Sequence, residues 1–325
     1  MPDGLDAMVP AGGVASDCNA VGGASAGGGS SALPVGDDRA ACVVTGARDE
    51  AVPPRCEAVI DATPSRTVTV GGWRGDAAFA GYDTVVEEVP VALEFNGISH
   101  AVMLATPADL EDFALGFALT EGIVRDATEV RDIEVEPRCE GIAVKLDIAS
   151  ERFAGLKERR RSMTGRTGCG LCGTESLAHA VRSLPAVASR AVTSRAAIAS
   201  ALNTLPARQP LQRATGGAHA AAWCDTDGRV LLVREDVGRH NALDKLAGAL
   251  ARGGFDADAG FALVTSRASV EMVQKAQALG IGILVAVSAP TALAIDIATR
   301  AGICLAGFAR GRNLNLYSGA ARIRA

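Results

Sequence analysis

Two cysteines, Cys169 and Cys172, are separated by two residues in the glycine-rich stretch TGCGLCGTESL. A cysteine does sulfur chemistry as its thiolate, which positive charge and a helix N-terminus both stabilise. Five basic residues lie between positions 157 and 166, and an amphipathic helix is predicted directly after the pair, from Glu175 to Leu184. Glycines on both sides allow the loop to bend. The pattern therefore indicates a reactive cysteine pair that could take up a persulfide and move between a donor and an acceptor.

Three other roles are compatible with a Cys-x-x-Cys spacing. A structural zinc site needs four ligands, and the chain adds His179 but no second cysteine pair or paired histidines. A dithiol for disulfide exchange usually lies in a small thioredoxin-type unit, whose element order differs from the order expected here. A purely structural role suits glycine-flanked cysteines poorly. The residues favour persulfide transfer, with disulfide exchange and a zinc site as the alternatives.

Polar side chains follow two predicted strands in the second half of the chain. His240 lies in REDVGRHNALDKL, between a strand and a helix, and Thr265, Ser266 and Arg267 stand at the end of the strand GFALVTS. Open α/β sheets build their ligand crevices at such strand ends, and hydroxyl, backbone and arginine donors suit phosphate groups. We expect one shared pocket. The alternative is that these residues only cap helices and line a solvated loop.

The elements that must position these motifs follow two patterns. β-branched alternation split by Asn96-Gly97 predicts an antiparallel hairpin, and Thr106 followed by Pro107 predicts the start of a helix that ends at Gly122. From position 216 onward, apolar strands alternate with amphipathic helices, as in a sheet covered by helices. The expected fold class is α/β (α+β), a mixed sheet covered by helices with a smaller N-terminal α+β lobe.

The chain is expected to have four parts. Residues 1–65 are rich in Gly, Ala and Ser and predict a disordered tail. Residues 66–165 form the small α+β lobe, residues 166–186 the cysteine loop and its following helix, and residues 187–325 the α/β domain.

Composition and charge exclude several classes of function. The formal net charge of −5 argues against general nucleic-acid binding. No apolar stretch reaches the roughly 20 residues that cross a bilayer, and MPDGLDAMVP lacks the features of a secretory signal. We therefore expect a cytoplasmic protein, in which thiols are reduced.

Several segments together resemble the formate dehydrogenase accessory sulfurtransferase family, FdhD/NarQ. They are EEVPVALEFNGISHAVMLATPADLEDFALGFALTEGI, RTGCGLCGTESL, REDVGRHNALDKL, VTSRASVEMVQKA and AVSAPTALAIDIA. The resemblance, from about Val85 to Ile323, implies that Cys169 accepts a persulfide from a cysteine desulfurase, with Cys172 as its partner. The sulfur would pass to a molybdenum cofactor carrying two molybdopterin guanine dinucleotides, before that cofactor enters apo formate dehydrogenase.

The same resemblance implies a fold, an acceptor site and an assembly. The fold would be cytidine deaminase-like and the protein a homodimer. The family's cofactor-binding segment falls near the C-terminus, on Phe308, Ala309, Arg310, Gly311, Arg312 and Asn313. We expect the acceptor, for which GDP is the expected mimic, to bind this segment together with the strand-end residues His240, Thr265, Ser266 and Arg267. A zinc deaminase needs His-x-Glu and Pro-Cys-x-x-Cys; the chain has HNA and TSRAS, so neither zinc nor deamination is expected. A scaffold that binds the cofactor without carrying sulfur is the non-catalytic alternative, and it would not need the cysteine pair.

Overall fold

Alternating β-branched residues around Asn96-Gly97 form the hairpin that the sequence predicts. The computed structural model describes the backbone of residues 63–161 and 182–325, with side chains from 63 to 157 and from 182 onward. In it, β3 (Val89–Phe95) and β4 (Ile98–Ala105) pair antiparallel. Asn96 and Gly97 have φ angles of 48° and 78°, as a two-residue hairpin turn requires.

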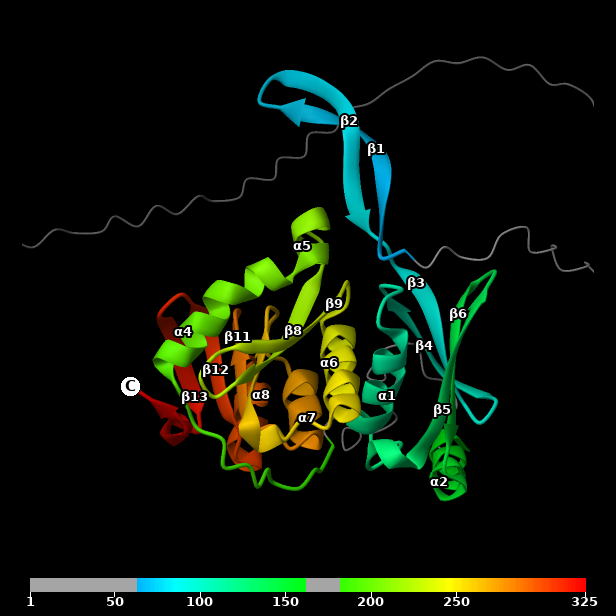
Figure 1. Ribbon diagram of the computed structural model, residues 1–325, viewed down its shortest axis with the longest axis vertical. Coiled ribbons are helices and arrows are strands. Elements are labelled where there is room, and N and C mark those ends of the chain that lie inside the picture. The colour runs from blue at the N-terminus through cyan, green and yellow to red at the C-terminus, as the bar shows by residue number, and fades with distance from the viewer. Residues whose placement is uncertain (1–62, 162–181) are drawn as a thin grey trace, which may run out of the picture. The chain divides into compact units, whose positions relative to one another are not determined.

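A four-stranded sheet grows from this hairpin. β6 (Gly141–Ile148) pairs with β3 in parallel and β5 (Val130–Arg138) pairs with β6 antiparallel, in the order β4-β3-β6-β5 (Figure 1). α1 (Leu110–Thr120) packs on the face formed by the alternate, fully buried residues of β3. α2 (Ser150–Arg161) adds the buried Leu156 to the same core. We call residues 89–161 the small lobe.

α1 begins later than the sequence predicts. The helix starts at Leu110, after Asp109 in a left-handed conformation with φ of 52°. Thr106, the predicted N-cap, instead donates its backbone N–H to Asp236 and accepts a hydrogen bond from the N–H of Val237 with its hydroxyl. A partner 130 residues away in the chain therefore displaces the local cap.

The second half of the chain folds around a six-stranded mixed sheet, which we call the α/β domain (residues 187–325). Its order is β13-β12-β11-β10-β8-β9. β9, β10, β11 and β12 run in one direction, because β8 is antiparallel to β9 and β10 while β10, β11 and β12 are mutually parallel. The strands are β8 (His219–Asp225), β9 (Val230–Asp236), β10 (Gly260–Val264), β11 (Ile283–Ala286), β12 (Cys304–Arg310) and β13 (Asn313–Ser318).

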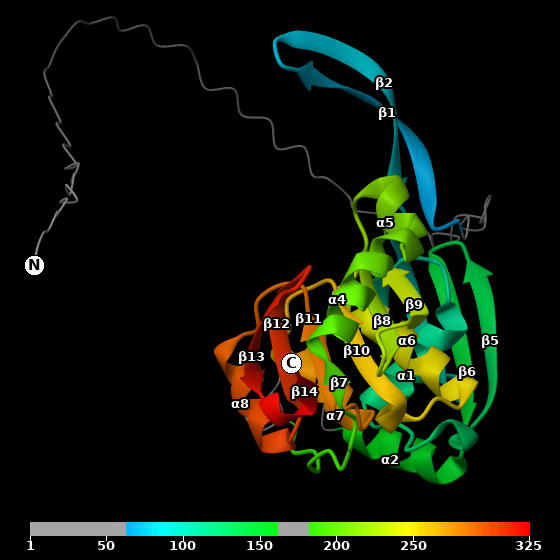
Figure 2. The same ribbon diagram turned by 60° about the vertical axis from the view of Figure 1, so that its left-hand side comes forward.

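Helices cover both faces of this sheet, so its strands are continuously apolar. One face packs against α6 (Arg239–Gly253), α7 (Val270–Ala278) and α8 (Ala292–Ala301). The other packs against α4 (Arg195–Thr204), which crosses the sheet in Figure 2. The short elements are β7 (Thr193–Ser194), α5 (Pro210–Thr215), β14 (Ile323–Arg324) and the 3₁₀ turns Ala127–Glu129, Leu205–Arg208, Ala257–Ala259 and Ala320–Arg322. The predicted fold class, a mixed sheet covered by helices with a smaller α+β lobe, is confirmed.

A further hairpin precedes the small lobe. β1 (Ser65–Arg74) and β2 (Ala77–Val86) form a two-stranded sheet of their own, turning at Gly75 with φ of 62°. This hairpin was not predicted from the sequence. The tail expected for residues 1–65 lies outside the described residues up to position 62, and β1 already begins at Ser65. Within the described residues, no helix has the length and apolar character needed to cross a membrane.

Candidate functional site

Four strands end at one edge of the α/β sheet and bring most of the predicted polar residues together. β9, β10, β11 and β12 share a direction, so the residues that follow them emerge at the same edge. α6 and α7 both begin there, after Gly238 and Ser269. Helix N-termini offer unpaired N–H groups and a positive dipole end. This edge therefore suits an anionic ligand.

His240 and Arg239 carry buried nitrogen atoms that have no partner among the described residues. In the described part of the chain, neither Nε2 of His240 nor Nε of Arg239 has a hydrogen-bond partner, although both atoms are buried. Burial, followed by the charge of Arg239, lowers the pKa of His240 to about 4, so the imidazole is neutral at pH 7. A buried polar atom without a partner is costly. The pair thus fits a site whose polar ligand completes the hydrogen bonds.

Glu271 faces His240 from the first turn of α7. Its Oε2 lies 3.9 Å from Nε2 of His240, which is beyond hydrogen-bond length. Burial opposes its ionisation, yet hydrogen bonds at the start of α7 and the charge of Arg239 leave its pKa lowered. An ionised carboxylate therefore stands beside a neutral imidazole at this edge.

The three predicted residues after β10 differ in what they can offer. The Thr265 hydroxyl accepts a hydrogen bond from the N–H of Ala220 at 2.9 Å, which ties it to β8. Ser266 is buried and its hydroxyl donates to the carbonyl of Arg267 at 3.0 Å. Arg267 is exposed. Only the arginine presents its side chain at the surface of the edge.

The segment between β12 and β13 contains a strained aromatic residue. Phe308 has a φ of 51°, and the β12–β13 register shifts between Gly307 and Arg310. A left-handed conformation costs a non-glycine residue about 1–3 kcal/mol and is typical of functional sites. The ring is 47% exposed, whereas Ala309 is fully buried in the core below. Gly311 also has a positive φ, and the remaining residues of the predicted segment are exposed: Arg310, Arg312 and Asn313.

Most of the other polar residues in REDVGRHN join the two lobes rather than line the edge. Lys245 and Asp236 form a fully buried ion pair, with Nζ 2.6 Å from Oδ2. The same carboxylate accepts from the N–H of Thr106 at 3.0 Å and from the amide of Asn241 at 3.0 Å. Glu235 accepts from two N–H groups at the start of α5. His240 and Arg239 are the residues of this motif that face the edge.

A second buried cluster links α1, α6 and α7. The ammonium of Lys275 donates to both carboxylate oxygens of Asp244, at 2.9 and 3.0 Å, and to Thr120 and Glu121, each at 3.0 Å. Burial disfavours the charged form, but the two carboxylates outweigh burial and raise the pKa of Lys275. We call Thr120, Glu121, Asp244 and Lys275 the seam cluster, because α1 belongs to the small lobe and α6 and α7 to the α/β domain.

The backbones of α1 and α6 touch beside this cluster. A Cβ atom at Gly116 would lie 1.7 Å from the carbonyl oxygen of Asp244, and one at Gly248 would lie 1.9 Å from that of Asp112. Only glycine allows so close an approach. The helices are therefore antiparallel, with the end of α1 beside the start of α6 and the His240 edge.

The segment that follows the cysteine loop is attached at the seam cluster. Nη1 of Arg182 donates to the carbonyl of Thr120 at 2.6 Å and lies 3.4 Å from Oε2 of Glu121. Cys169 and Cys172 lie outside the described residues. Nine residues lie between Cys172 and Arg182, and the ten steps that join them would span about 15 Å as a helix and at most about 33–36 Å when extended. The length of the chain alone therefore keeps Cys172 within about 36 Å of this attachment.

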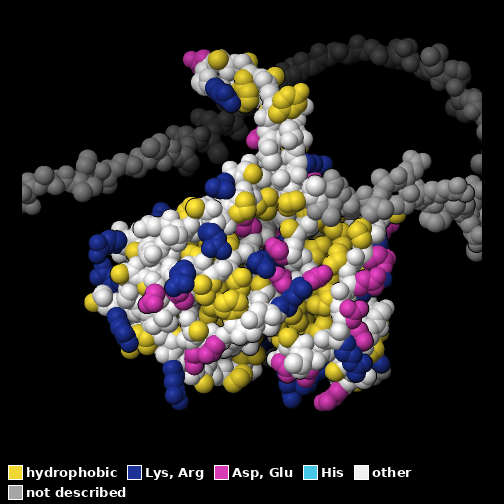
Figure 3. All heavy atoms as spheres, in the orientation of Figure 1, with side chains coloured by type: hydrophobic (Ala, Val, Ile, Leu, Met, Phe, Trp, Pro, Cys, Tyr) yellow, Lys and Arg dark blue, Asp and Glu magenta, His cyan; other side chains and the backbone are white. Residues whose placement is uncertain are grey.

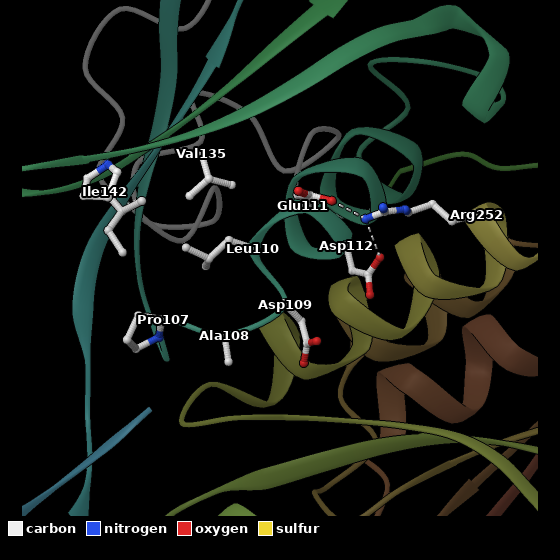
Figure 4. A pocket seen from close by; sticks show the side chains of 10 residues that line it. Pro107, Ala108, Asp109, Leu110, Glu111, Asp112, Val135, Ile142 and Arg252 are labelled. Atoms are coloured by element: carbon white, nitrogen blue, oxygen red, sulfur yellow. Dashed lines mark hydrogen bonds and ion pairs between the residues drawn. The ribbon is translucent and has the colours of Figure 1, made fainter. Parts of the chain in front are cut away.

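A cavity of about 340 Å³ lies elsewhere, in the small lobe between α1 and β5. Hydrophobic side chains gather on this face in Figure 3, and Figure 4 shows Leu110, Val135 and Ile142 around the cavity. Arg252 closes one side through ion pairs with Glu111 and Asp112 (Figure 4). Of the predicted site residues that the structure describes, none lines it. Residues 63–157 and 182–325 also contain no group of three or more His, Cys, Asp or Glu able to hold a metal.

Three residues at this edge and in the seam cluster were not predicted from the sequence. Glu271, Gln274 and Lys275 lie in VEMVQKA, and each contacts a charged or backbone group from another element. The sequence feature that could have indicated them is the group of polar residues on α7, a helix whose other face packs into the core. Polar residues on a buried helix need partners, but their identity depends on the tertiary fold.

Comparison with known proteins shows which family the chain belongs to. The model of the FdhD/NarQ family matches residues 86–324. A protein of Cupriavidus necator named sulfur carrier protein FdhD is 59% identical over 258 residues, which cover 79% of this chain and 90% of the relative. A Variovorax paradoxus protein of the same name is 59% identical over 249 residues, covering 77% and 90%. A crystal structure from Desulfotalea psychrophila, of a proposed formate dehydrogenase accessory protein, has the same fold, with a TM-score of 0.64 and 24% identity over 80% of this chain and 99% of that one. The chain therefore belongs to the FdhD/NarQ family.

Proposed function

We propose that the protein is a sulfur carrier for the maturation of a formate dehydrogenase. Cys169 would accept a persulfide from a cysteine desulfurase in the cytoplasm and deliver the sulfur to a molybdenum cofactor with two molybdopterin guanine dinucleotides. The names of the relatives support the general role of a sulfur carrier. Transfer of the persulfide to the cofactor is supported by the attachment of Arg182 at the seam cluster, beside the edge where His240 and Glu271 face each other.

Uptake of sulfur needs no external oxidant or reductant. The Cys169 thiolate attacks the outer sulfur of the donor persulfide, the donor S–S bond breaks, and the donor thiolate leaves as the new S–S bond forms on Cys169. Basic residues in the preceding segment would favour the attacking thiolate.

Cys172 has two possible roles in delivery. As a relay, its thiolate attacks the outer sulfur and takes over the persulfide. As a resolving thiol, it attacks the sulfur of Cys169, so that a disulfide forms and the outer sulfur leaves as hydrosulfide; the two thiols then supply the two electrons. Full delivery by a Cys172→Ala variant would show that neither role is required.

The acceptor substrate would dock through its guanine nucleotides. Phe308 offers a partly exposed ring for stacking, and the two exposed arginines Arg310 and Arg312 suit phosphates. Gly311 permits close approach of the backbone. At the other end of the site, the unpartnered nitrogens of Arg239 and His240 fit a polar ligand.

Intact-protein mass spectrometry tests the carrier role. Incubation with a cysteine desulfurase and cysteine should add the mass of one sulfur, removable by reductant, to wild type and not to Cys169→Ala. A Cys169→Ala variant that still gained the sulfur and restored formate dehydrogenase activity would refute the proposal. Stoichiometric zinc in the same sample would support the zinc alternative, and light scattering would test the homodimer that belongs to the same proposal.

Calorimetric titration with GDP tests the acceptor site. Arg310→Ala and Arg312→Ala each remove one charge-assisted hydrogen-bond donor to phosphate, which should weaken GDP binding by about 1.5–3 kcal/mol, or roughly 10- to 150-fold. Unchanged affinity in both folded variants would remove this segment from the site.

A further inference from the structure

Two glutamines of α7 hold the main chain that follows the cysteine loop. Gln274 and Gln277 are 4% and 9% exposed. Nε2 of Gln274 donates to the carbonyl of Arg182 at 3.1 Å, and Nε2 of Gln277 donates to the carbonyls of Leu184 and Pro185 at 3.0 and 2.8 Å. Residues 182–192 have no regular secondary structure. The glutamine amides therefore satisfy carbonyl groups that no helix or strand serves.

The side chain of Arg182, in the same segment, is held by residues at the C-terminal end of α1. Arg182 donates to the carbonyl of Thr120 and pairs with Glu121. Those two residues are in turn held by Lys275, which lies between the glutamines on α7. Helix α7 therefore forms hydrogen bonds both to the backbone of the segment and to Thr120 and Glu121, which bind the Arg182 side chain.

α7 also carries part of the strand-end edge. Its first turn presents Glu271 to His240, and Gln277 lies six residues further along, about 9 Å at the rise of an α-helix. A rigid helix therefore fixes the distance between the edge where an acceptor would dock and the point where the cysteine segment leaves the fold.

We propose that Gln274 and Gln277 are positioning residues for sulfur delivery. This inference rests on the proposed carrier function and adds to it which residues orient the cysteine pair toward the acceptor. Delivery would occur within a docked complex and depend on orientation, whereas loading by a separate donor would not. Loss of the glutamines should therefore slow delivery selectively.

The size of the effect separates positioning from simple tethering. Without the glutamine hydrogen bonds, Arg182 is still held through its side chain, and the next main-chain attachment is Val187, whose N–H donates to the carbonyl of Ala301 at 2.8 Å. Even if the whole stretch up to Val187 were released, lengthening the tether from ten residues to fifteen would lower the effective concentration only about two-fold. If the glutamines set an orientation, the rate of sulfur delivery should fall by about tenfold or more, because small misplacements of reacting groups lower reaction rates by such factors.

The test uses full-length protein with Gln274→Leu, Gln277→Leu and the double variant. Leucine keeps the volume and helix propensity while removing the donors. Gln209→Leu is the matched control, because Gln209 is also buried, at 6% exposure, but lies at the start of α5. For each protein we would measure loading of Cys169 by mass spectrometry, GDP affinity by calorimetry, single-turnover sulfur delivery to the molybdenum cofactor, and the unfolding temperature.

In the glutamine variants we expect loading and GDP affinity within two-fold of wild type and delivery at least tenfold slower, whereas Gln209→Leu should behave as wild type. Delivery within two-fold of wild type, or an equal decline in loading and delivery, would overturn it. A wild type that neither loads nor delivers sulfur would instead refute the proposed function itself. If the double variant does not fold, the single variants decide by the same criteria.

Discussion

Replacing Lys275 by methionine should lower the free energy of unfolding by about 3–5 kcal/mol, because it leaves a buried carboxylate without its cation. Asp244 is 1% exposed and would keep one donor, the Thr120 hydroxyl at 2.6 Å. Methionine retains the aliphatic stem, so the cavity contribution is small. Glu121, the other partner, has a side chain 35% exposed and can return to water, so the removal of its ion pair adds little.

The assay is urea denaturation at pH 7, followed by tryptophan fluorescence and circular dichroism. Most of the loss should be recovered in the double variant Lys275→Met/Asp244→Asn, because the neutral amide does not need a cation. Lys145→Met is the control, since Lys145 pairs with Glu134 and Glu136 at the surface. This substitution should lower the free energy of unfolding by at most about 1 kcal/mol.

The pH dependence gives an independent check of the cause. Burial already raises the pKa of Asp244 in the folded protein despite the opposing charge of Lys275, and loss of that cation in Lys275→Met should raise it further. A group with a raised folded pKa stabilises at low pH and loses that contribution as pH rises. The deficit of the variant should therefore be smaller at pH 4 than at pH 8. A loss below 1 kcal/mol at pH 7, or no recovery in the double variant, would refute the reasoning.

Three further predictions concern other residues of the site. Phe308→Gly should be more stable than Phe308→Ala by about 1 kcal/mol in thermal unfolding, because only glycine adopts a φ of 51° without strain; equal stabilities would contradict the strain. The pKa of His240 is about 4 in the folded protein and about 6.5 in the unfolded chain. The neutral imidazole therefore contributes fully to the free energy of unfolding above pH 6.5, and about 3 kcal/mol is lost as the pH falls toward 4. Denaturation curves between these pH values should show a shallower decline for His240→Gln, and parallel curves would argue against it. Gly116→Leu should force α1 and α6 apart and cost at least about 3 kcal/mol; a cooperative transition at the wild-type urea midpoint would contradict the close contact.

Local patterns in the sequence predict much of the fold. The Asn96-Gly97 turn and the alternation of apolar strands with helices correspond to β3, β4 and the α/β domain, because turn geometry and burial act over a few residues. The start of α1 could not be predicted this way, since the partner of Thr106 is Asp236. Long-range pairing of this kind has no local signature.

In the candidate site too, local features could be predicted from the sequence and long-range contacts could not. Phe308 and His240 stand at strand ends, which follow from the order of elements. Which polar residues face a ligand could not be predicted, because Asp236 and Asn241 have the residue types of a ligand site but are used between the lobes. The left-handed conformation of Phe308 also depends on the β12–β13 register.

The ion pair between Lys245 and Asp236 also has a consequence for biosynthesis. Thr106, which shares this cluster, leaves the ribosome 130 residues before Asp236, an interval of roughly 6–26 s at 5–20 residues per second. During that time the small lobe must wait with its polar contact groups and the face of α1 uncovered. Nascent chains stalled before α6 should therefore be the species that chaperones retain and proteases remove, and a slower-translated stretch between the lobes would lengthen that exposure.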